Sequence, residues 1–465
     1  RSTSRALPFG PERAVRPSSS MGLVPWLLAA VLFVGGCATH SDRFAPVEEA
    51  LLAGEPEQAL EAVDGALGGR EADTTLFHLE RGMLRRMTGD YRGSNADLER
   101  AKGLMEELGV TSVSETLGSL TMAEGVTSYV GAPHEQVLLH LVKAFNYLDL
   151  GQRDAARVEA LQVDLRLQVL AAEAEGSIYD ADPFARYLSG ILFEALGERS
   201  DALIAYRKAY RTYRRQEAAI GVHPPPSLKA ALLRLTDALG LDDEHAGYRR
   251  TFGDIDWRTM AEQARRAHVI LVSGEGLAPV KVENSLNVQD AQGKLHRIAL
   301  PAYRSRPWRL ESAALAAGEE RAPAAVVADV DAIARTVLEE RMGAITARAL
   351  ARAVAKNAAV DEAAEAHPLA GLAVNIAGFA SERADLRSWR TLPARYRLAW
   401  LDLPPGSYDL TATFGGREGR TVEDVRLREG EYHFLIDHWI APGTGSVGGM
   451  QHGDKAEKPA EPGSR

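Results

Sequence analysis

Two pairs of histidines lie close to carboxylates, and this combination of side chains can bind zinc or transfer protons. His134 is followed by Glu135, with His140 further along the same predicted helix. A zinc-protease helix needs two imidazoles one helical turn apart, whereas a spacing of six residues places these two rings on different faces. His433 and His438 lie five residues apart in a predicted strand, which directs their rings to opposite faces of a sheet. Neither pair therefore predicts a metal site or a catalytic site.

Two further patterns fit active-site motifs in spacing but not in context. Residues 443–448 have the glycine spacing of a dinucleotide-binding loop, but no predicted helix follows to offer its N-terminus to a pyrophosphate. Ser273 precedes a glycine-rich stretch but lacks the glycine two residues earlier that a nucleophile elbow requires. We therefore expect no cofactor, no catalytic residue and no enzymatic activity.

Cys37 is the residue whose surroundings predict chemistry most specifically. It is the only cysteine in the chain, so it cannot form an intramolecular disulfide. An uncharged apolar run, residues 21–36, precedes it, is short for a spanning helix and has the length of a signal-peptide core. The run ends in Gly35 and Gly36, and small residues directly before a cysteine resemble the bacterial lipobox. The pattern predicts lipidation of the Cys37 thiol, and Ala38 in place of aspartate predicts sorting to an outer membrane.

The charge balance restricts the partners. The chain contains 54 Lys and Arg and 64 Asp and Glu, of which residues 1–36 hold four Arg and one Glu. A mature chain starting at Cys37 therefore has a net charge of about −13. A surface this acidic argues against a nucleic-acid partner and shows no basic patch for anionic lipid. Attachment to a membrane is therefore expected through acyl chains, of which two or more anchor much better than one.

The same arrangement of small and aromatic residues recurs three times between about residue 75 and residue 216. In the copy at residues 184–215, Gly190 stands where the first helix must approach its partner closely, Gly197 makes the turn, and Tyr206 lies on the second helix. The other copies have Ala144, Tyr147, Gly151, Ala156 and Val163 at these offsets, or Gly82, Gly89, Tyr91, Ser94, Leu98 and Ala101.

These repeats resemble tetratricopeptide (TPR) repeats. Antiparallel helices pack at short range where one presents Gly, Ala or Ser to the other, and stacking stabilises units that cannot fold alone. A degenerate first unit is expected around Gly54, and a closing helix is predicted from Leu228 to Leu239 after the prolines at 224–226. The alternative is an unrelated helical bundle with Ala-rich packing. Both interpretations predict an α-helical region.

A concave groove is the usual binding surface of such an array. Phe145 and Tyr187 are at groove-facing positions of two first helices, where they could contact a protein partner or form the core between repeats. A basic run on one predicted helix, residues 207–215, could meet an acidic partner, although a solvated helix face also explains it.

The C-terminal half has a different character, because all tryptophans beyond Cys37 lie after residue 250. Strands bounded by Gly, Asn and Pro are predicted at residues 268–272, 280–283, 295–300, 396–401, 407–414, 421–427 and 432–440. Helices are predicted at 328–357 and 369–377.

Asp385, Arg387 and Trp389 form a dense polar and aromatic cluster that could border an interaction surface or have turn and capping roles. At Pro404-Pro405-Gly406, a turn is predicted in which the glycine takes a positive φ.

The predicted fold class is α+β, with an N-terminal α-helical TPR-like solenoid followed by a C-terminal β-rich, sandwich-like domain with inserted helices. The predicted boundaries are residues 1–36 for a signal peptide with an upstream extension, 37–250 for the repeats, 255–442 for the β-rich mixed domain and 443–465 for a disordered tail.

Five segments, in this order and spacing, resemble an uncharacterised family of TPR-containing bacterial lipoproteins: Tyr129–Glu135, Ala144–Leu148, Ala156–Glu159, Gly276–Lys281 and Asp385–Pro393. The resemblance covers most of the chain after Cys37. It implies a helical N-terminal part, a mixed C-terminal part and an envelope location, and it implies no activity, substrate or site.

The sequence thus favours a non-catalytic scaffold that is lipid-anchored in the outer membrane, faces the periplasm and binds envelope proteins through its helical repeats. Two alternatives remain open at this point. One is an accessory of a secretion or surface-assembly machine. The other is an envelope enzyme that acts on cell-wall glycan through carboxylates which the sequence cannot bring together.

Overall fold

The computed structural model describes residues 40–112, 128–173, 177, 182–289, 295–308, 310–366 and 383–440. The chain divides into Arg1–Asp42 and one compact unit, Arg43–Arg465. Apart from the first residues of α2, the described helices and strands belong to this second unit. None of the described helices combines the length and the apolarity that a membrane span requires.

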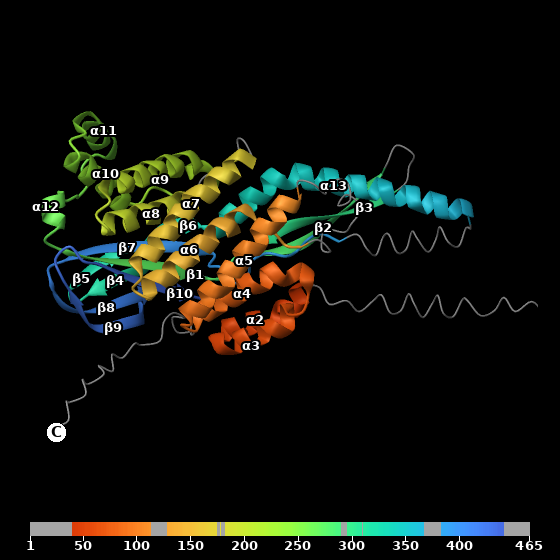
Figure 1. Cartoon of the computed structure of the whole chain (residues 1–465), viewed down its shortest axis with the longest axis horizontal. Helices are drawn as coiled ribbons and strands as arrows, with labels where there is room; N and C mark the ends of the chain where they lie inside the picture. Colours follow the sequence, from red (N-terminus) through yellow and green to blue (C-terminus); the bar gives the residue numbers. More distant parts are fainter. Residues whose placement is uncertain are drawn as a thin grey trace, which may run out of the picture. The chain divides into compact units, whose positions relative to one another are not determined.

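Helices come first along the chain, and their order follows the labels in Figure 1. They are α2 (His40–Ala53), α3 (Pro56–Leu67), the short η2 (Glu71–Asp73), α4 (Thr74–Met87), α5 (Tyr91–Ser112), α6 (Pro133–Asp149), α7 (Arg153–Glu173), α8 (Pro183–Ala195), α9 (Arg199–Ile220), α10 (Pro226–Ala238), α11 (Asp242–Phe252) and α12 (Met260–Gln263). The three predicted repeats correspond to the pairs α4–α5, α6–α7 and α8–α9.

One turn geometry joins the helices of each pair. Gly89, Gly151 and Gly197 have φ angles of 82°, 70° and 79°, in the left-handed region that glycine adopts without strain. The N–H of each glycine bonds the carbonyl three residues earlier, and the next N–H bonds the carbonyl five residues earlier. This is the Schellman arrangement, which satisfies carbonyls left open at a helix end. The repeated glycine therefore sets where each helix pair turns.

Close packing within a pair depends on a second glycine. A Cβ at Gly190 would lie 2.4 Å from the ring of Tyr206, and one at Gly82 would lie 2.9 Å from Leu98. The close approach predicted at Gly190 is confirmed. The predicted closing helix is also present as α10, but it is not the last, because α11 follows it through the same kind of turn at Gly240.

Strands follow from Ala267 onward. They are β1 (Ala267–Glu275), β2 (Val280–Gln289), β3 (Leu295–Arg304), β4 (Ala313–Ala317), β5 (Glu320–Pro323), β6 (Ala325–Asp329), β7 (Arg395–Leu403), β8 (Gly406–Phe414), β9 (Arg417–Leu427) and β10 (Tyr432–Trp439), with α13 (Val330–Ala366) between β6 and β7. All seven predicted strands are present in the described residues, and the chain is a mixed α and β protein. The sequence did not predict β4, β5 and β6, which have only four or five residues each.

Two four-stranded sheets and one hairpin organise these strands. One sheet has the order β10-β1-β7-β6, the other has the order β5-β4-β8-β9, and β2 and β3 form a two-stranded sheet. Strand β10 runs parallel to β1, with Leu435 opposite Leu271, whereas β7 pairs with β1 antiparallel. Helix α13 packs on the β2–β3 hairpin through Ile345 and Ala349.

Strand β1 lies between two layers, which explains its unbroken apolar run. Val269 and Leu271 join the core shared by the two sheets, whereas Ile270 and Val272 join the core formed with the helices. All nine residues of β1 are buried. The sheet β10-β1-β7-β6 is therefore covered by helices on one face and by the second sheet on the other.

One turn prediction is wrong. The positive φ expected at Gly406 is not found, because Gly406 already belongs to β8 and lies close to the ring of Tyr408. The predicted helix at 369–377 and the predicted disordered tail at 443–465 lie outside the described residues.

Candidate functional site

The inner faces of α4 and α6 hold a stretch of irregular chain that leads into β7. We call residues 384–394 the connecting segment; it contains neither helix nor strand. Its backbone donates to carboxylates of the two helices, although the partners are more than 250 residues apart in sequence. The candidate site is this row of contacts between the helices and the connecting segment.

Glu80 of α4 makes the densest set of these contacts. Its carboxylate accepts the backbone N–H groups of Arg390 at 2.6 Å and Thr391 at 3.1 Å, and the Thr391 hydroxyl at 2.6 Å. The side chain is completely buried. Burial raises the pKa of Glu80 to about 7, although the hydrogen bonds from Thr391 and Arg390 act in the opposite direction. The Glu80 carboxyl group thus binds backbone N–H groups where water is excluded. In such a place, the loss of a hydrogen-bond partner lowers the free energy of unfolding most.

Glu135 of α6 repeats this arrangement one repeat further along. One carboxylate oxygen accepts the backbone N–H of Trp389 at 2.8 Å. The other accepts the backbone N–H of Ala132 at 2.8 Å, which caps the start of α6, and the hydroxyl of Tyr129. Trp389 is 1% exposed, and its indole N–H donates to the Thr391 hydroxyl at 3.1 Å. Glu135 therefore fixes both a helix start and the connecting segment.

Asp385 and Arg387 form the first anchor of the connecting segment. The Arg387 guanidinium donates to both carboxylate oxygens of Asp385, at 2.9 and 2.8 Å, and to the carbonyl of Ala72 at 2.8 Å. Burial alone would raise the pKa of Asp385, but the hydrogen bonds and charge of Arg387 lower it below its usual value. The predicted cluster of Asp385, Arg387 and Trp389 is thus brought together against the helices, where its side chains bind other parts of the same chain.

Tyr396, directly after the connecting segment, continues the contact along the next repeats. Its ring lies 6.1 Å from that of Phe145 and 5.3 Å from that of Phe184, measured between ring centroids. Phe145, which the sequence placed on the groove, therefore packs against β7. Tyr187 is fully buried among helices instead, with its ring near Tyr206 and its hydroxyl bonded to Ser227 at 2.7 Å.

The inner faces of α8, α9 and α10 are covered as well, by strands β6 and β7, which they meet through polar contacts. Arg234 pairs with Glu194 at 2.7 Å, and its guanidinium lies 5.8 Å from the ring centroid of Trp400 in β7. The hydroxyl of Tyr213 donates to the carbonyl of Val327 at 2.7 Å. The sheet thus occupies the inner face of the later repeats, as the connecting segment does for the earlier ones.

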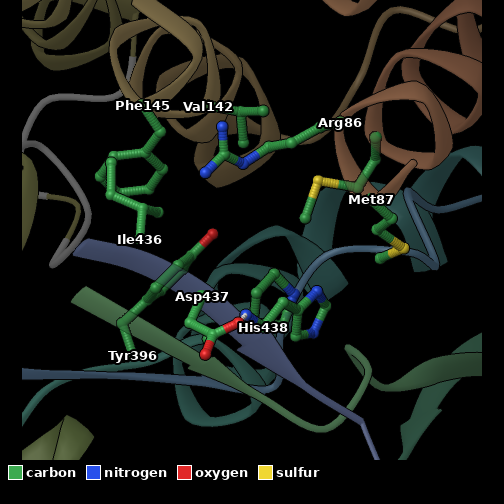
Figure 2. Close-up of a pocket in the computed structure, with 11 residues that line it drawn as sticks. Arg86, Met87, Val142, Phe145, Tyr396, Ile436, Asp437 and His438 are labelled. Carbon is green, nitrogen blue, oxygen red and sulfur yellow. Dashed lines mark hydrogen bonds between the residues drawn. The ribbon is translucent and has the colours of Figure 1, made fainter. Parts of the chain in front are cut away.

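A small cavity remains between α4, α6 and the strands β7 and β10 (Figure 2). Figure 2 shows Arg86 and Phe145 on the helix side and Tyr396, Asp437 and His438 on the sheet side. The space open to the centre of a water molecule is about 20 Å³, which suits a single water and excludes an organic substrate.

The titratable groups of this cavity are shifted by burial. Burial lowers the pKa of His438 to about 4, so the ring is neutral and its Nε2–H donates to the carbonyl of Gly276 at 2.7 Å. Burial raises the pKa of Asp437 to about 6. Among the described residues, the Tyr396 hydroxyl has no hydrogen-bond partner. A cavity of this size has room for one water molecule beside the neutral histidine.

The other residues that the sequence singled out, namely the histidines, the basic run and Cys37, do not come together in one site. Within the described residues, no three His, Cys, Asp or Glu side chains converge on a position that could hold a metal ion. His140 bonds Glu159 at 2.8 Å, and His134 is buried with its pKa lowered to about 4 by burial. In the basic run, Lys208 pairs with Asp164 at 2.9 Å. Cys37, predicted to be lipidated, lies outside the described residues.

Sequence reasoning missed Glu80 and Thr391 as members of the site. A signal for Glu80 was present, because a carboxylate lies among Leu76, Leu79 and Met83 on the apolar face of its helix. A charged residue at such a position is almost never fully buried without partners. No local signal marks Thr391, because its partner lies 311 residues away.

No protein-family model matches the sequence, and no curated protein matches it. Solved structures with a similar backbone include the apo form of RapI, with a TM-score of 0.34 and 13% identity over 48% of this chain and 56% of that one. MamA gives a TM-score of 0.28 and 14% identity over 44% of this chain and 90% of that one. Aspartyl phosphate phosphatase F from Bacillus subtilis gives a TM-score of 0.31 and 14% identity over 49% of this chain and 54% of that one.

The chain thus spans about half the length of RapI and of the phosphatase. With TM-scores below 0.5, these similarities assign neither a fold family nor a function.

Proposed function

We propose that this chain is a lipid-anchored protein of the bacterial envelope, in which a TPR-like solenoid and a β-rich, sandwich-like domain form a non-catalytic scaffold for other envelope proteins. The observation that carries the scaffold proposal is the way the inner helix faces bind a segment of irregular chain. Glu80 and Glu135 hold backbone N–H groups of residues 389–391 at 2.6 to 3.1 Å. This is peptide recognition by a helical array, with the chain's own segment as the peptide.

The chemistry of these contacts favours binding over catalysis. Buried carboxylates that accept backbone N–H groups bind the main chain of the segment they hold. The cavity beside them has room for one water molecule. Because the inner faces already hold the connecting segment and the sheet, envelope partners are expected at exposed helix faces, such as that of α5 around Arg100.

The anchor in this proposal rests on the sequence around Cys37. The thiol would carry acyl chains, and the protein would face the periplasm from an outer membrane where the cell has two membranes. Two or more chains give stable attachment, whereas one gives only reversible binding. No polybasic patch is then needed, in agreement with the negative net charge.

Mass spectrometry of protein purified from membranes tests the anchor. We expect an acylated N-terminus at Cys37 in the native chain and none in Cys37→Ser. An unmodified chain that retains residues 21–36 would overturn the lipid anchor and leave the scaffold proposal untouched.

Photo-crosslinking in cells tests the scaffold. With a photoreactive residue in place of Arg100, we expect adducts with one set of envelope proteins; Leu286 of β2, also exposed, is the matched control position. Equal adducts at both positions would argue against a specific surface on the helices. Incubation with peptidoglycan provides the opposite test, because released fragments would contradict a non-catalytic role.

A further inference from the structure

Helices α4 and α6 lie side by side and run in the same direction. At their ends, the Arg86 guanidinium of α4 donates to Asn146 of α6 at 2.8 Å and pairs with Asp149 at 2.8 Å. At their starts, the backbone N–H of Tyr129, before α6, donates to the carbonyl of Ala72, before α4, at 3.1 Å. The helical part therefore has two edges here, one formed by the chain before α4 and α6 and the other by the turns after them.

The first turn of α2 lies at the first of these edges. The Arg43 guanidinium pairs with the Asp73 carboxylate at 3.5 Å and donates to the carbonyl of Ala66 at 3.4 Å. Phe44, the next residue, is fully buried, so the chain is held in place from this point onward. We call this edge the starting edge, and it consists of Arg43, residues 66–73 and residues 129–133.

Only a short tether separates the starting edge from the proposed lipid anchor. Three residues lead from Cys37 to His40, where α2 begins, and an extended chain covers at most about 11 Å in that length. Three further residues of helix, up to Arg43, add about 4.5 Å. Acyl chains on Cys37 would therefore keep Arg43 within about 15 Å of the membrane surface. The opposite edge lies a helix length beyond it, since the 14 residues of α4 span about 21 Å.

The exposed residues of the starting edge suit a position against lipid. Residues 128–133 carry no charge, and Val130 among them is 39% exposed. Arg70 and Glu71, both exposed, cancel each other in charge. The edge thus presents an apolar side chain and no net charge, so anionic lipid head groups would not repel it.

We propose that the starting edge rests on the surface of the membrane that holds the anchor, with the turns at Gly89 and Gly151 directed away from it. This inference rests on the proposed lipidation of Cys37. The acyl chains hold the edge at the lipid surface, and Val130 adds an apolar contact. The two turns then lie about 20 Å further from the membrane, on the side from which soluble proteins approach.

Fluorescence quenching by lipid tests this orientation. Because Cys37 is the only cysteine and its thiol would be acylated, an introduced cysteine is the only thiol that a fluorophore can label. The lipidated chain purified from membranes is placed in phosphatidylcholine vesicles whose head groups carry a nitroxide, which quenches at short range. A fluorophore at Arg70→Cys should lose most of its emission, whereas one at Arg92→Cys, just after the Gly89 turn, should retain it. Each variant lacks one exposed arginine, so the two are matched.

A second pair of positions tests whether the edge lies on the surface along its length. Val130→Cys should be quenched as Arg70→Cys is, whereas Gln152→Cys, exposed at the turn after α6, should not be. Equal quenching at the two edges, stronger quenching at position 92 or 152, or quenching at position 70 without position 130 would overturn the orientation.

Flotation of the vesicles in a density gradient separates failure of this inference from failure of the anchor. A chain that floats with the vesicles but shows one of these other quenching patterns contradicts the orientation alone. A chain that does not float with the vesicles contradicts the lipid anchor, and the orientation with it.

Discussion

The inner and outer faces of the helices reverse the usual distribution of polar and apolar side chains. On the inner faces of α4 and α6, the carboxylates of Glu80 and Glu135 are buried and hold backbone N–H groups. On the outer face of α7, Val158 and Leu165 are exposed to solvent. The inner face has its ligand within the chain, whereas these apolar side chains of α7 remain exposed.

The largest effect is expected from removing an aromatic ring at the inner face. Tyr396→Ala should lower the free energy of unfolding by about 4 kcal/mol, because it empties a buried site between Phe145 and Phe184. Tyr396→Phe should leave stability unchanged or raise it slightly, since the hydroxyl has no partner among the described residues. Urea denaturation followed by tryptophan fluorescence measures both. A Phe variant as unstable as the Ala variant would show that the hydroxyl, not the ring, supports the interface.

Removing the Glu80 carboxylate should have the next largest effect. Glu80→Ala leaves two backbone N–H groups and the Thr391 hydroxyl without their acceptor, which should cost about 3 to 4 kcal/mol. Hydrogen exchange of residues 384–394 should rise in this variant more than that of α9. Glu106→Ala is the matched control, because that side chain is 66% exposed. Equal destabilisation by both substitutions would contradict the role given to Glu80.

The raised pKa of Glu80 makes part of this stability depend on pH. Since the pKa is 4.5 in the unfolded chain and about 7 when folded, the neutral acid is favoured in the native state. Its contribution is fully present below pH 4.5 and is lost as the pH rises through 7, by up to about 3 kcal/mol. The difference in unfolding free energy between the native chain and Glu80→Gln should therefore change over pH 4.5 to 7. A constant difference would show that burial does not shift this group.

The smallest effect on stability is expected at the outer face. Leu165→Gln should change the unfolding free energy by less than about 0.5 kcal/mol, because the side chain is 54% exposed and packs on little. Urea denaturation measures this change. A loss above about 1 kcal/mol would mean that this face of α7 belongs to the core, and the contrast between the two faces would disappear.

Much of the local structure could be predicted from the sequence because its causes are local. Gly89, Gly151 and Gly197 set the turns between helices, and Gly190 permits a close approach that no larger residue allows. The strands at 396–401 and 407–414 follow from their residue types and the bounding prolines. By contrast, the short strands β4 and β5 carry no strong β signal; β4 forms because β8 offers an edge to pair with, and β5 pairs in turn with β4.

The sequence by itself determined the helix pairs, their turns and most strands, because each depends on residues within a few positions of one another. Only the tertiary structure decided that the groove positions around Phe145 face the chain's own C-terminal part. The contacts responsible, such as Glu135 with Trp389 and Glu80 with Arg390, join residues 254 and 310 positions apart. No periodicity encodes such pairs. They form because a buried carboxylate and the N–H groups of an irregular backbone segment satisfy each other when water is excluded.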